Sequence, residues 1–214
     1  MFVFLLPTSR FKIWLLNKFG HRIHPTAKFG VCWVKNIECF DLAEGVQIGN
    51  LNTFRDMKLV QIGRGSRIVM FNWIIGVSGF EPGAVDNGSL RTLRMGKGCH
   101  VVSSHYLDCG GGLILKDGAW MTGVRSTVLT HAFDPVNGGM LLNPVTFEPG
   151  SATATNCTLL PGVTLGEGAL LAAGSTAWTG QQIAGAHLHG GVPARRLTPI
   201  TIDESLYERH RTPG

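Results

Sequence analysis

Residues 147–176 read F-E-P-G-S-A, T-A-T-N-C-T, L-L-P-G-V-T, L-G-E-G-A-L and L-A-A-G-S-T, and this stretch decides the fold. An apolar residue opens most of these hexads, and small residues follow it. A period of six belongs neither to an α-helix nor to a simple alternating strand. It suits a parallel β-helix, in which short strands alternate with corners. The opening side chain then points into a narrow core, and Gly, Ala or Ser allows the backbone to bend.

The same period extends upstream, with slips, so that it covers residues 23–182. Three hexads make one triangular coil, so the sequence predicts an all-β fold of about seven coils stacked roughly 4.8 Å apart. A β-sandwich is the alternative, but its turns recur roughly every 8–12 residues. Upstream of residue 147, we expect these side chains to point inward: Ile23, Phe29, Leu42, Ile48, Phe54, Ile62, Ile68, Ile74, Met95, Val101, Leu107, Leu115, Met121 and Thr127.

The composition agrees with one domain of this kind. The chain has 214 residues and 29 glycines, which suits a narrow prism with many corners. Its five cysteines include no CxxC pair, which predicts reduced thiols in the cytoplasm rather than a zinc site. The net charge is +5 and the basic residues are scattered. This pattern argues against nucleic-acid binding and is compatible with a polyanionic small ligand.

The two ends of the chain differ from the β-helix, which we expect over residues 23–197. In residues 1–22, Ser9 is placed to cap an amphipathic helix that Gly20 ends. The segment resembles neither a signal peptide nor a membrane span. It either covers the open first coil or touches a membrane surface through residues 1–19, which would bring a cytoplasmic protein to the inner face of the membrane. Residues 198–214 are predicted to be a C-terminal tail with a short helix.

Two segments interrupt the hexads, at residues 75–94 and 132–146. Both are rich in Gly, Pro, Asn and Asp, as loops are. Loops on a rigid scaffold often carry selectivity. We therefore expect these two excursions either to choose the substrate or to be passive decorations.

The hexads Leu159–Thr164 and Leu165–Leu170, followed by Gly191-Val-Pro-Ala-Arg195, resemble the hexapeptide-repeat acyltransferases. This family includes sugar and polysaccharide O-acetyltransferases, and residues 103–112 and 123–131 resemble its polysaccharide-modifying branch. The resemblance implies a left-handed β-helix and a homotrimer. It also implies an acyl-CoA bound between neighbouring prisms and a sugar or cell-surface glycan as acceptor.

Acyl transfer to a hydroxyl or amine needs a base that takes the acceptor's proton, and histidine suits this role near neutral pH. No Gly-x-Ser-x-Gly motif is present, so direct transfer without an acyl-enzyme is expected. His131 matches the family's catalytic histidine, which precedes a loop. Asp134 either orients its ring or forms a turn before Pro135. His105 is the rival candidate for the base. It either binds the acceptor or lines the same cleft from a neighbouring chain, or it has a structural role.

The resemblance also assigns cofactor contacts by position. Ala154, Ala173 and Gly174 match small corner residues where the backbone approaches CoA, and Thr179 matches a polar residue after the last regular coil. Arg195 matches a basic residue that meets phosphate, with Arg196 beside it. For the small residues, the alternative is simple corner geometry.

These features predict an acyl-CoA-dependent acyltransferase that uses acetyl-CoA or another acyl-CoA as co-substrate and needs no metal. Two alternatives stay open. One is a non-catalytic β-helix scaffold, which would not bind CoA. The other is a metal site similar to that of γ-carbonic anhydrase, with His100, His105 and His131 as candidate ligands.

Overall fold

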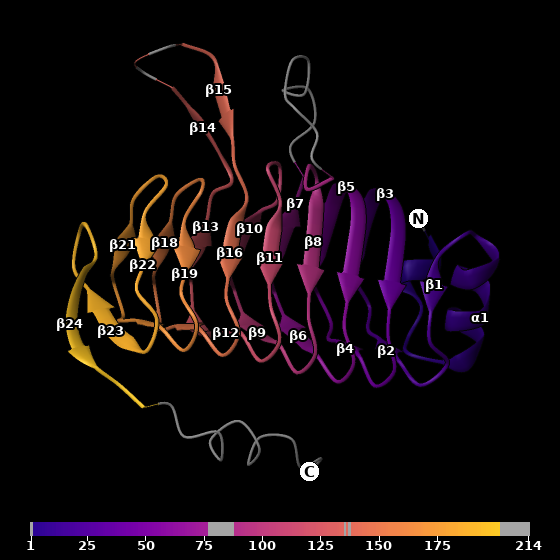
Figure 1. Cartoon of the computed structure of the whole chain (residues 1–214). Coiled ribbons are helices and arrows are strands. Elements are labelled where there is room, and N and C mark those ends of the chain that lie inside the picture. The colour runs from indigo at the N-terminus through magenta and orange to yellow at the C-terminus, as the bar shows by residue number, and fades with distance from the viewer. Residues whose placement is uncertain (1, 77–87, 135, 137, 202–214) are drawn as a thin grey trace.

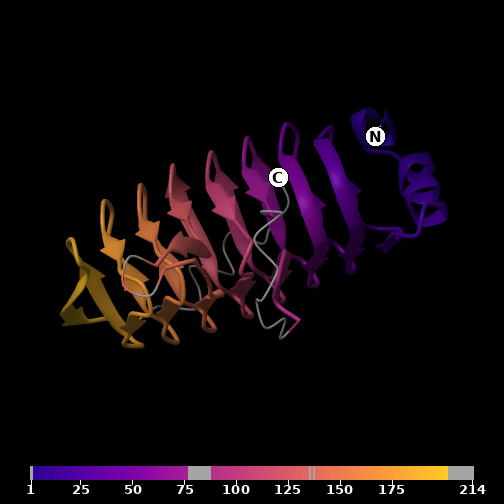
Figure 2. The same ribbon diagram turned by 90° about the horizontal axis from the view of Figure 1, so that it is seen from above.

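The structure is a computed structural model that describes residues 2–76, 88–134, 136 and 138–201. The chain winds into a three-sided prism whose strands stack in parallel from one coil to the next (Figures 1 and 2). The third face, defined below, has strands at seven successive levels. The prism is the parallel β-helix that the hexads predict, with the left hand that the resemblance implies.

Each face of the prism is a ladder of short parallel strands. The first face consists of β1 (Arg22–Ile23), the ends of β3 (Trp33–Leu42) and β5 (Thr53–Ile62), β8 (Thr92–Met95), β11 (Leu113–Leu115), β16 (Val145–Phe147), β19 (Thr164–Leu165) and β22 (Gln182–Ile183). The second consists of β2 (Lys28–Phe29), β4 (Gln47–Ile48), β6 (Arg67–Met70), β9 (His100–Ser103), β12 (Trp120–Val124), β17 (Ala152–Thr153), β20 (Leu170–Leu171) and β23 (His187–Gly190), with β24 (Arg195–Pro199) antiparallel to β23. The third consists of the starts of β3 and β5, then β7 (Trp73–Ile75), β10 (Tyr106–Asp108), β13 (Thr127–Val128), β18 (Thr158–Leu159) and β21 (Thr176–Ala177).

The core is one stack of side chains along the prism axis, and the hexad rule predicts most of it. Of the upstream residues predicted to point inward, all but Thr127 are buried. At that level Val128 is buried instead. The register between β12 and β9 shifts after Met121, and Gly123 and Arg125 have positive φ. This irregular corner moves the inward position along the chain by one residue.

An N-terminal cap, residues 2–19, covers the open end of the first coil (Figure 1). It comprises the 3₁₀-helix η1 (Phe2–Leu5) and the helix α1 (Arg10–Lys18). Ser9 caps α1 by accepting a hydrogen bond from the Lys12 N–H at 3.1 Å, as predicted. Ile13 and Leu16 are buried in the prism core. Among the described residues, no helix is both long and apolar enough to cross a membrane.

Lys12 is a fully buried cation that ties the cap together. Its Nζ donates to the carbonyl oxygens of Phe4 at 3.0 Å, Leu6 at 2.9 Å and Gly30 at 2.6 Å. Burial lowers the Lys12 pKa to about 8. The ammonium therefore stays largely charged at neutral pH, and it joins η1, α1 and the first coil.

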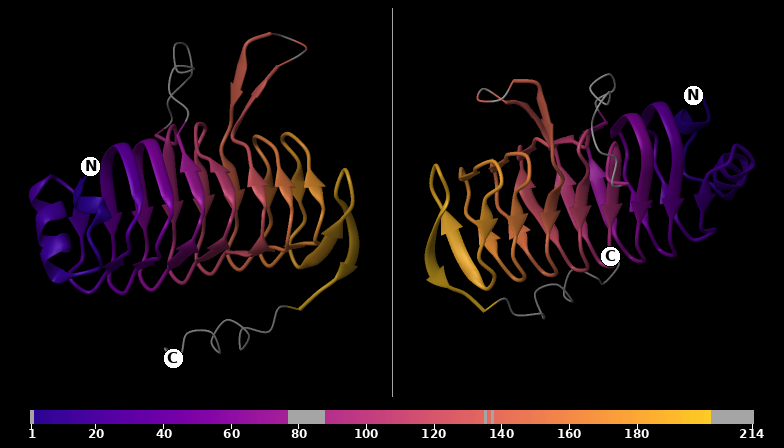
Figure 3. Two further views of the ribbon diagram at one scale, coloured as in Figure 1. Left: turned by 180° about the vertical axis from the view of Figure 1, so that it is seen from behind. Right: turned by 45° about the horizontal axis from the view of Figure 1, so that its top comes forward.

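The second excursion is an antiparallel hairpin that stands out from the edge between the third and first faces (Figures 1 and 3). It pairs β14 (His131–Phe133) with β15 (Met140–Leu142). The chain thus leaves the prism at the predicted place. Most of the first excursion and the predicted C-terminal helix lie outside the described residues.

Candidate active site

His131 stands at the base of the hairpin, where β13 has ended and β14 begins. Its side chain is 23% exposed. The Thr130 carbonyl oxygen accepts a hydrogen bond from the Asn143 N–H at 3.0 Å, which closes the base of the hairpin beside it. The imidazole is therefore held by ordered backbone at the prism surface, as expected for a histidine that precedes a protruding segment.

Asp108 is the residue that holds the His131 ring. It ends β10 one coil earlier and is fully buried. Its Oδ2 lies 2.6 Å from His131 Nδ1. The carboxylate also accepts the N–H groups of Gly110, Thr130 and His131 and the Thr130 hydroxyl, at 2.7–3.1 Å. A carboxylate surrounded by donors is an acceptor, so Nδ1 carries the hydrogen and Nε2 is the basic atom of the ring.

A glycine run that begins two residues after Asp108, at Gly110, lets the chain pass under the hairpin. A Cβ on Gly111 would lie 2.5 Å from the Thr130 oxygen and 2.7 Å from the Asn143 nitrogen. No side chain fits there without moving the backbone that carries His131. The Gly111 N–H also donates to Thr130 Oγ1 at 2.9 Å, which links the run to the Asp108 network.

The expectation that Asp134 orients the His131 ring is corrected by this geometry, since the Nδ1 partner is Asp108. Asp134 instead forms the turn that was its alternative role. Its Oδ1 accepts the Val136 N–H at 2.9 Å, and its N–H donates to the Gly139 oxygen at 3.0 Å. Asp134 lies on the outgoing arm of the hairpin, whereas Asp108 lies in the adjacent coil, where strand stacking brings it under His131.

The surroundings of His105 favour the structural role that was the alternative to acceptor binding. It is 1% exposed and lies at the edge between the second and third faces. The backbone N–H of His105 donates to Asn72 Oδ1 at 3.0 Å, and its ring Nδ1 accepts the backbone N–H of Ser126 at 3.1 Å. The Asn72 N–H in turn donates to Asn52 Oδ1 at 3.0 Å. His105 is thus one step of an inward polar column, and burial lowers its pKa to about 4.

Most of the predicted cofactor residues fall along that same edge, on its outer side. Ala154 is half-buried, and Ala173 and Gly174 are exposed one coil further on, where the Gly174 N–H donates to the Thr155 oxygen at 2.9 Å. Exposed Arg195 and Arg196 begin β24 just beyond them. Thr179 is also exposed, but it follows β21 and so lies on the edge that carries His131.

Within one chain, the His131 edge and the Ala154 edge lie on opposite sides of the third face. One hexad at about 3.3 Å per residue separates them, so they lie roughly 15–20 Å apart. The structure therefore brings Asp108 to His131 and gathers the small corner residues with the two arginines. It does not bring these two groups together within one chain.

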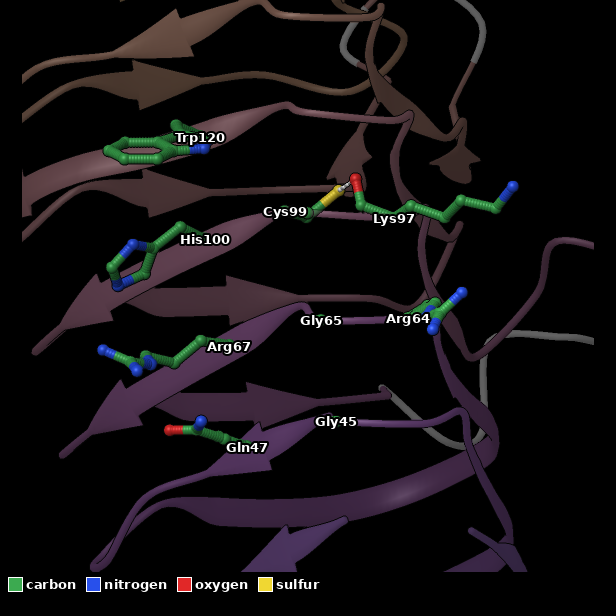
Figure 4. A pocket seen from close by; sticks show the side chains of 10 residues that line it. Gly45, Gln47, Arg64, Gly65, Arg67, Lys97, Cys99, His100 and Trp120 are labelled. Atoms are coloured by element: carbon green, nitrogen blue, oxygen red, sulfur yellow. Dashed lines mark hydrogen bonds between the residues drawn. The ribbon is translucent and has the colours of Figure 1, made fainter. Parts of the chain in front are cut away.

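A separate groove of about 530 Å³ lies on the second face, across the prism from His131. Figure 4 shows the residues that line it on successive strands and at the neighbouring edge: Gln47, Arg64, Arg67, Lys97, His100 and Trp120. Arg64 pairs with Glu44 at 3.0 Å. None of the predicted catalytic or CoA-contact residues lines this groove.

The histidines considered for a metal site are on different parts of the prism. His100 lies on the second face, His105 is buried at one edge, and His131 stands at another. Within the described ranges, no three His, Cys, Asp or Glu side chains are grouped so that they could hold a metal ion.

No protein-family model and no curated protein sequence matches the chain. Solved structures of AntD, an N-acyltransferase from Bacillus cereus, share its fold. A variant in complex with dTDP and coenzyme A matches with a TM-score of 0.64 at 18% identity, over 92% of this chain and 93% of that one. AntD with dTDP and 3-hydroxybutyryl-CoA matches with a TM-score of 0.57 at 17% identity, over 92% of both chains.

Asp108 is the functional candidate that the sequence did not reveal. It stands in the segment Ser103-Ser-His-Tyr-Leu-Asp-Cys-Gly-Gly-Gly112, next to the glycine run. A signal was present, because an acidic residue at an inward-facing strand end needs donors, and Gly-rich turns expose N–H groups. Which histidine it meets depends on how the coils stack.

Proposed function

We propose that this protein is a CoA-dependent acyltransferase that transfers an acyl group to a hydroxyl or amine of a sugar. The observation that carries the proposal is the hydrogen bond of 2.6 Å between buried Asp108 and partly exposed His131 at the base of a protruding hairpin. A histidine with its Nδ1 fixed by a carboxylate and its Nε2 as the basic atom is the arrangement that general-base catalysis requires.

The reaction follows from the roles of these groups. His131 Nε2 removes the proton of the acceptor hydroxyl or amine as its oxygen or nitrogen attacks the thioester carbonyl carbon. Asp108 holds the ring and stabilises the imidazolium that forms. When the tetrahedral intermediate collapses, the carbon–sulfur bond breaks and the imidazolium returns its proton to the CoA thiolate. The acyl group ends on the acceptor, and no acyl-enzyme is needed.

The co-substrate is proposed to lie along the edge formed by Ala154, Ala173 and Gly174. Small side chains leave backbone amides accessible to the amide groups of a pantetheine arm. Arg195 and Arg196 supply positive charge for phosphates at the end of that edge. AntD is described in complex with coenzyme A together with dTDP or a dTDP-amino sugar. This supports acyl-CoA and a nucleotide sugar as the ligand classes, with the acetyl group as the acyl chain we expect.

The same proposal requires a homotrimer. The His131 edge of one chain and the Ala154 edge of another can form one cleft, whereas within one chain the third face separates them. Trp33, Trp73 and Tyr106 are exposed on this face and are aligned by strand register. Such aromatic rows are typical of surfaces that become buried between subunits.

The non-catalytic scaffold is the second reading, and it predicts that CoA does not bind. The metal-site hypothesis is weakened because His100, His105 and His131 lie on different parts of the prism. We suggest incubating the full chain with acetyl-CoA and a panel of nucleotide sugars and glycans, followed by mass spectrometry. An acetylated product that the wild type makes and His131→Ala does not make would support the proposal. No product and no CoA binding in calorimetry would favour the scaffold.

A further inference from the structure

The net positive charge of this protein lies in the first residues of the chain, although Asp41 of the paired strand β3 neutralises Arg22 at 3.0 Å. Residues 1–37 contain six basic residues and no Asp or Glu: Arg10, Lys12, Lys18, Arg22, Lys28 and Lys35. The whole chain has 19 basic and 14 acidic residues. Residues 38–214 therefore hold 13 basic and 14 acidic residues and have a net charge of −1. All six cationic side chains except Lys12 belong to exposed residues.

The same end exposes large apolar side chains. In the cap, Phe2 is 80% exposed, Phe11 62%, Trp14 54% and Phe19 66%. The buried side of α1, through Ile13 and Leu16, already covers the first coil. The exposed aromatic residues are therefore not needed to close the prism. Their exposure costs solubility unless a partner covers them.

The aromatic and cationic groups lie together on the outer side of α1. The Phe11 and Trp14 rings stack with centroids 6.0 Å apart. The Lys18 Nζ lies 5.8 Å from the centre of the Trp14 ring. Phe and Trp beside Lys and Arg are the composition of helices that lie in the headgroup region of a bilayer. The three hydrogen bonds of Lys12 hold η1 against this helix, so both parts of the cap are presented as one rigid unit.

We propose that the N-terminal cap docks peripherally on an anionic lipid surface. The aromatic side chains enter the headgroup layer while Arg10 and Lys18 face lipid phosphates. The helix of nine residues is about 14 Å long and lies on the bilayer rather than across it. A second copy of the cap is a poor partner, because residues 2–19 carry only basic charges and each copy would bring the same positive charge.

This inference does not depend on the acyltransferase proposal. It gains strength from a trimer of the kind proposed above, because a closed three-fold ring places three caps at one end. Three weak contacts on one surface then act together through their high effective concentration.

The test uses the full chain and sedimentation with two kinds of vesicle, pure phosphatidylcholine and phosphatidylcholine with about 30 mol% phosphatidylglycerol, whose anionic headgroups attract basic residues. We expect clear binding to the anionic vesicles, weakened by added salt. Arg10→Glu/Lys18→Glu should lower partitioning by roughly fivefold or more per charge. Phe11→Ser/Trp14→Ser should abolish it. Both pairs are exposed, so the melting temperature should stay near that of the wild type.

Matched controls sit outside the cap. Arg67→Glu/Lys97→Glu makes the same change of net charge on the second face, and Trp178→Ser removes an exposed Trp at the far end. Both should bind vesicles like the wild type. Equal binding to the two kinds of vesicle, or equal losses in cap and control variants, would overturn the proposal. So would cap variants that keep vesicle binding but lose a higher oligomer, because the cap would then be an interface between copies.

Discussion

His105 and His131 both lie at corners of the prism, but their surroundings are opposite. The His105 corner turns inward, and its ring is buried in a column of polar side chains between coils. The His131 corner is opened by the hairpin, whose antiparallel pairing of His131 with Leu142 draws the backbone outward. The comparison shows that a position at a corner does not by itself decide the role of a histidine. What decides it is whether the next coil follows directly or is interrupted.

The largest effect should come from removing the ring at the open corner. His131→Ala is expected to lower kcat roughly 10²–10⁴-fold, the usual contribution of a positioned acid–base group. Affinity for acyl-CoA should change little, because the imidazole acts on the acceptor. His24→Ala, at an exposed histidine in the first coil, is the matched control for steady-state kinetics. If His131→Ala kept near-normal turnover while His105→Ala lost it, the base would be at the buried corner.

Asp108→Asn is the next strongest test, because it leaves the shape of the site but disturbs the ring that Asp108 positions. We expect kcat to fall by roughly 100-fold while the KM for acyl-CoA stays close to that of the wild type. Thr130→Ser keeps a hydroxyl beside the carboxylate and serves as the control. A parallel rise of both KM values with no loss of kcat would contradict a positioning role.

The buried corner should appear in the pH dependence of stability. Burial lowers the His105 pKa to about 4 from its usual value of 6.5. Between these values the unfolded chain binds more protons than the folded chain. The free energy of unfolding should therefore fall as the pH decreases from 6.5 to 4, by up to about 3 kcal/mol from this group. Denaturant unfolding of wild type and His105→Asn at pH 7 and pH 4.5 measures this. If the free energy of unfolding fell by the same amount in both proteins, the prediction would be refuted.

Two substitutions of His105 separate hydrogen bonding from volume. His105→Leu leaves the Ser126 N–H without its acceptor and should lower the free energy of unfolding by about 1–3 kcal/mol. His105→Asn offers an oxygen of the kind that Asn52 and Asn72 use in the same column, so it should lose less. Unfolding at pH 7 gives both values. Equal losses would show that the hydrogen bond to Ser126 contributes little.

The smallest expected effect is at the Ala154 edge, where the CoA phosphates are proposed to bind. Arg195→Ala should weaken CoA binding by roughly tenfold, because it removes one charged hydrogen bond to phosphate beside other contacts. Calorimetry with CoA measures it, and Arg94→Ala is a matched control at an exposed arginine on the first face. Unchanged CoA affinity would remove Arg195 from the proposed site and leave this edge with a structural role only.

The sequence by itself determined the coil and most of its core. A repeat of six needs only the side chains of its own segment to set strand, corner and inward face, so Leu159, Leu165 and Leu171 could be assigned without a structure. The helix capped by Ser9 and the departure of the chain after His131 are also local features. The same local rule was wrong at Thr127, because the irregular corner around Gly123 is a matter of backbone register between two coils.

Only the tertiary structure decided which polar residues meet. Asp108 and His131 are 23 residues apart, whereas a regular coil has 18. Their contact therefore depends on the extra residues in that coil and on the stacking of β13 against β10. His105 is buried for a related reason, since the residues that bond to it, Asn72 and Ser126, come from the coils on either side. Contacts between coils depend on register, and a periodic pattern specifies register only where no residue is inserted.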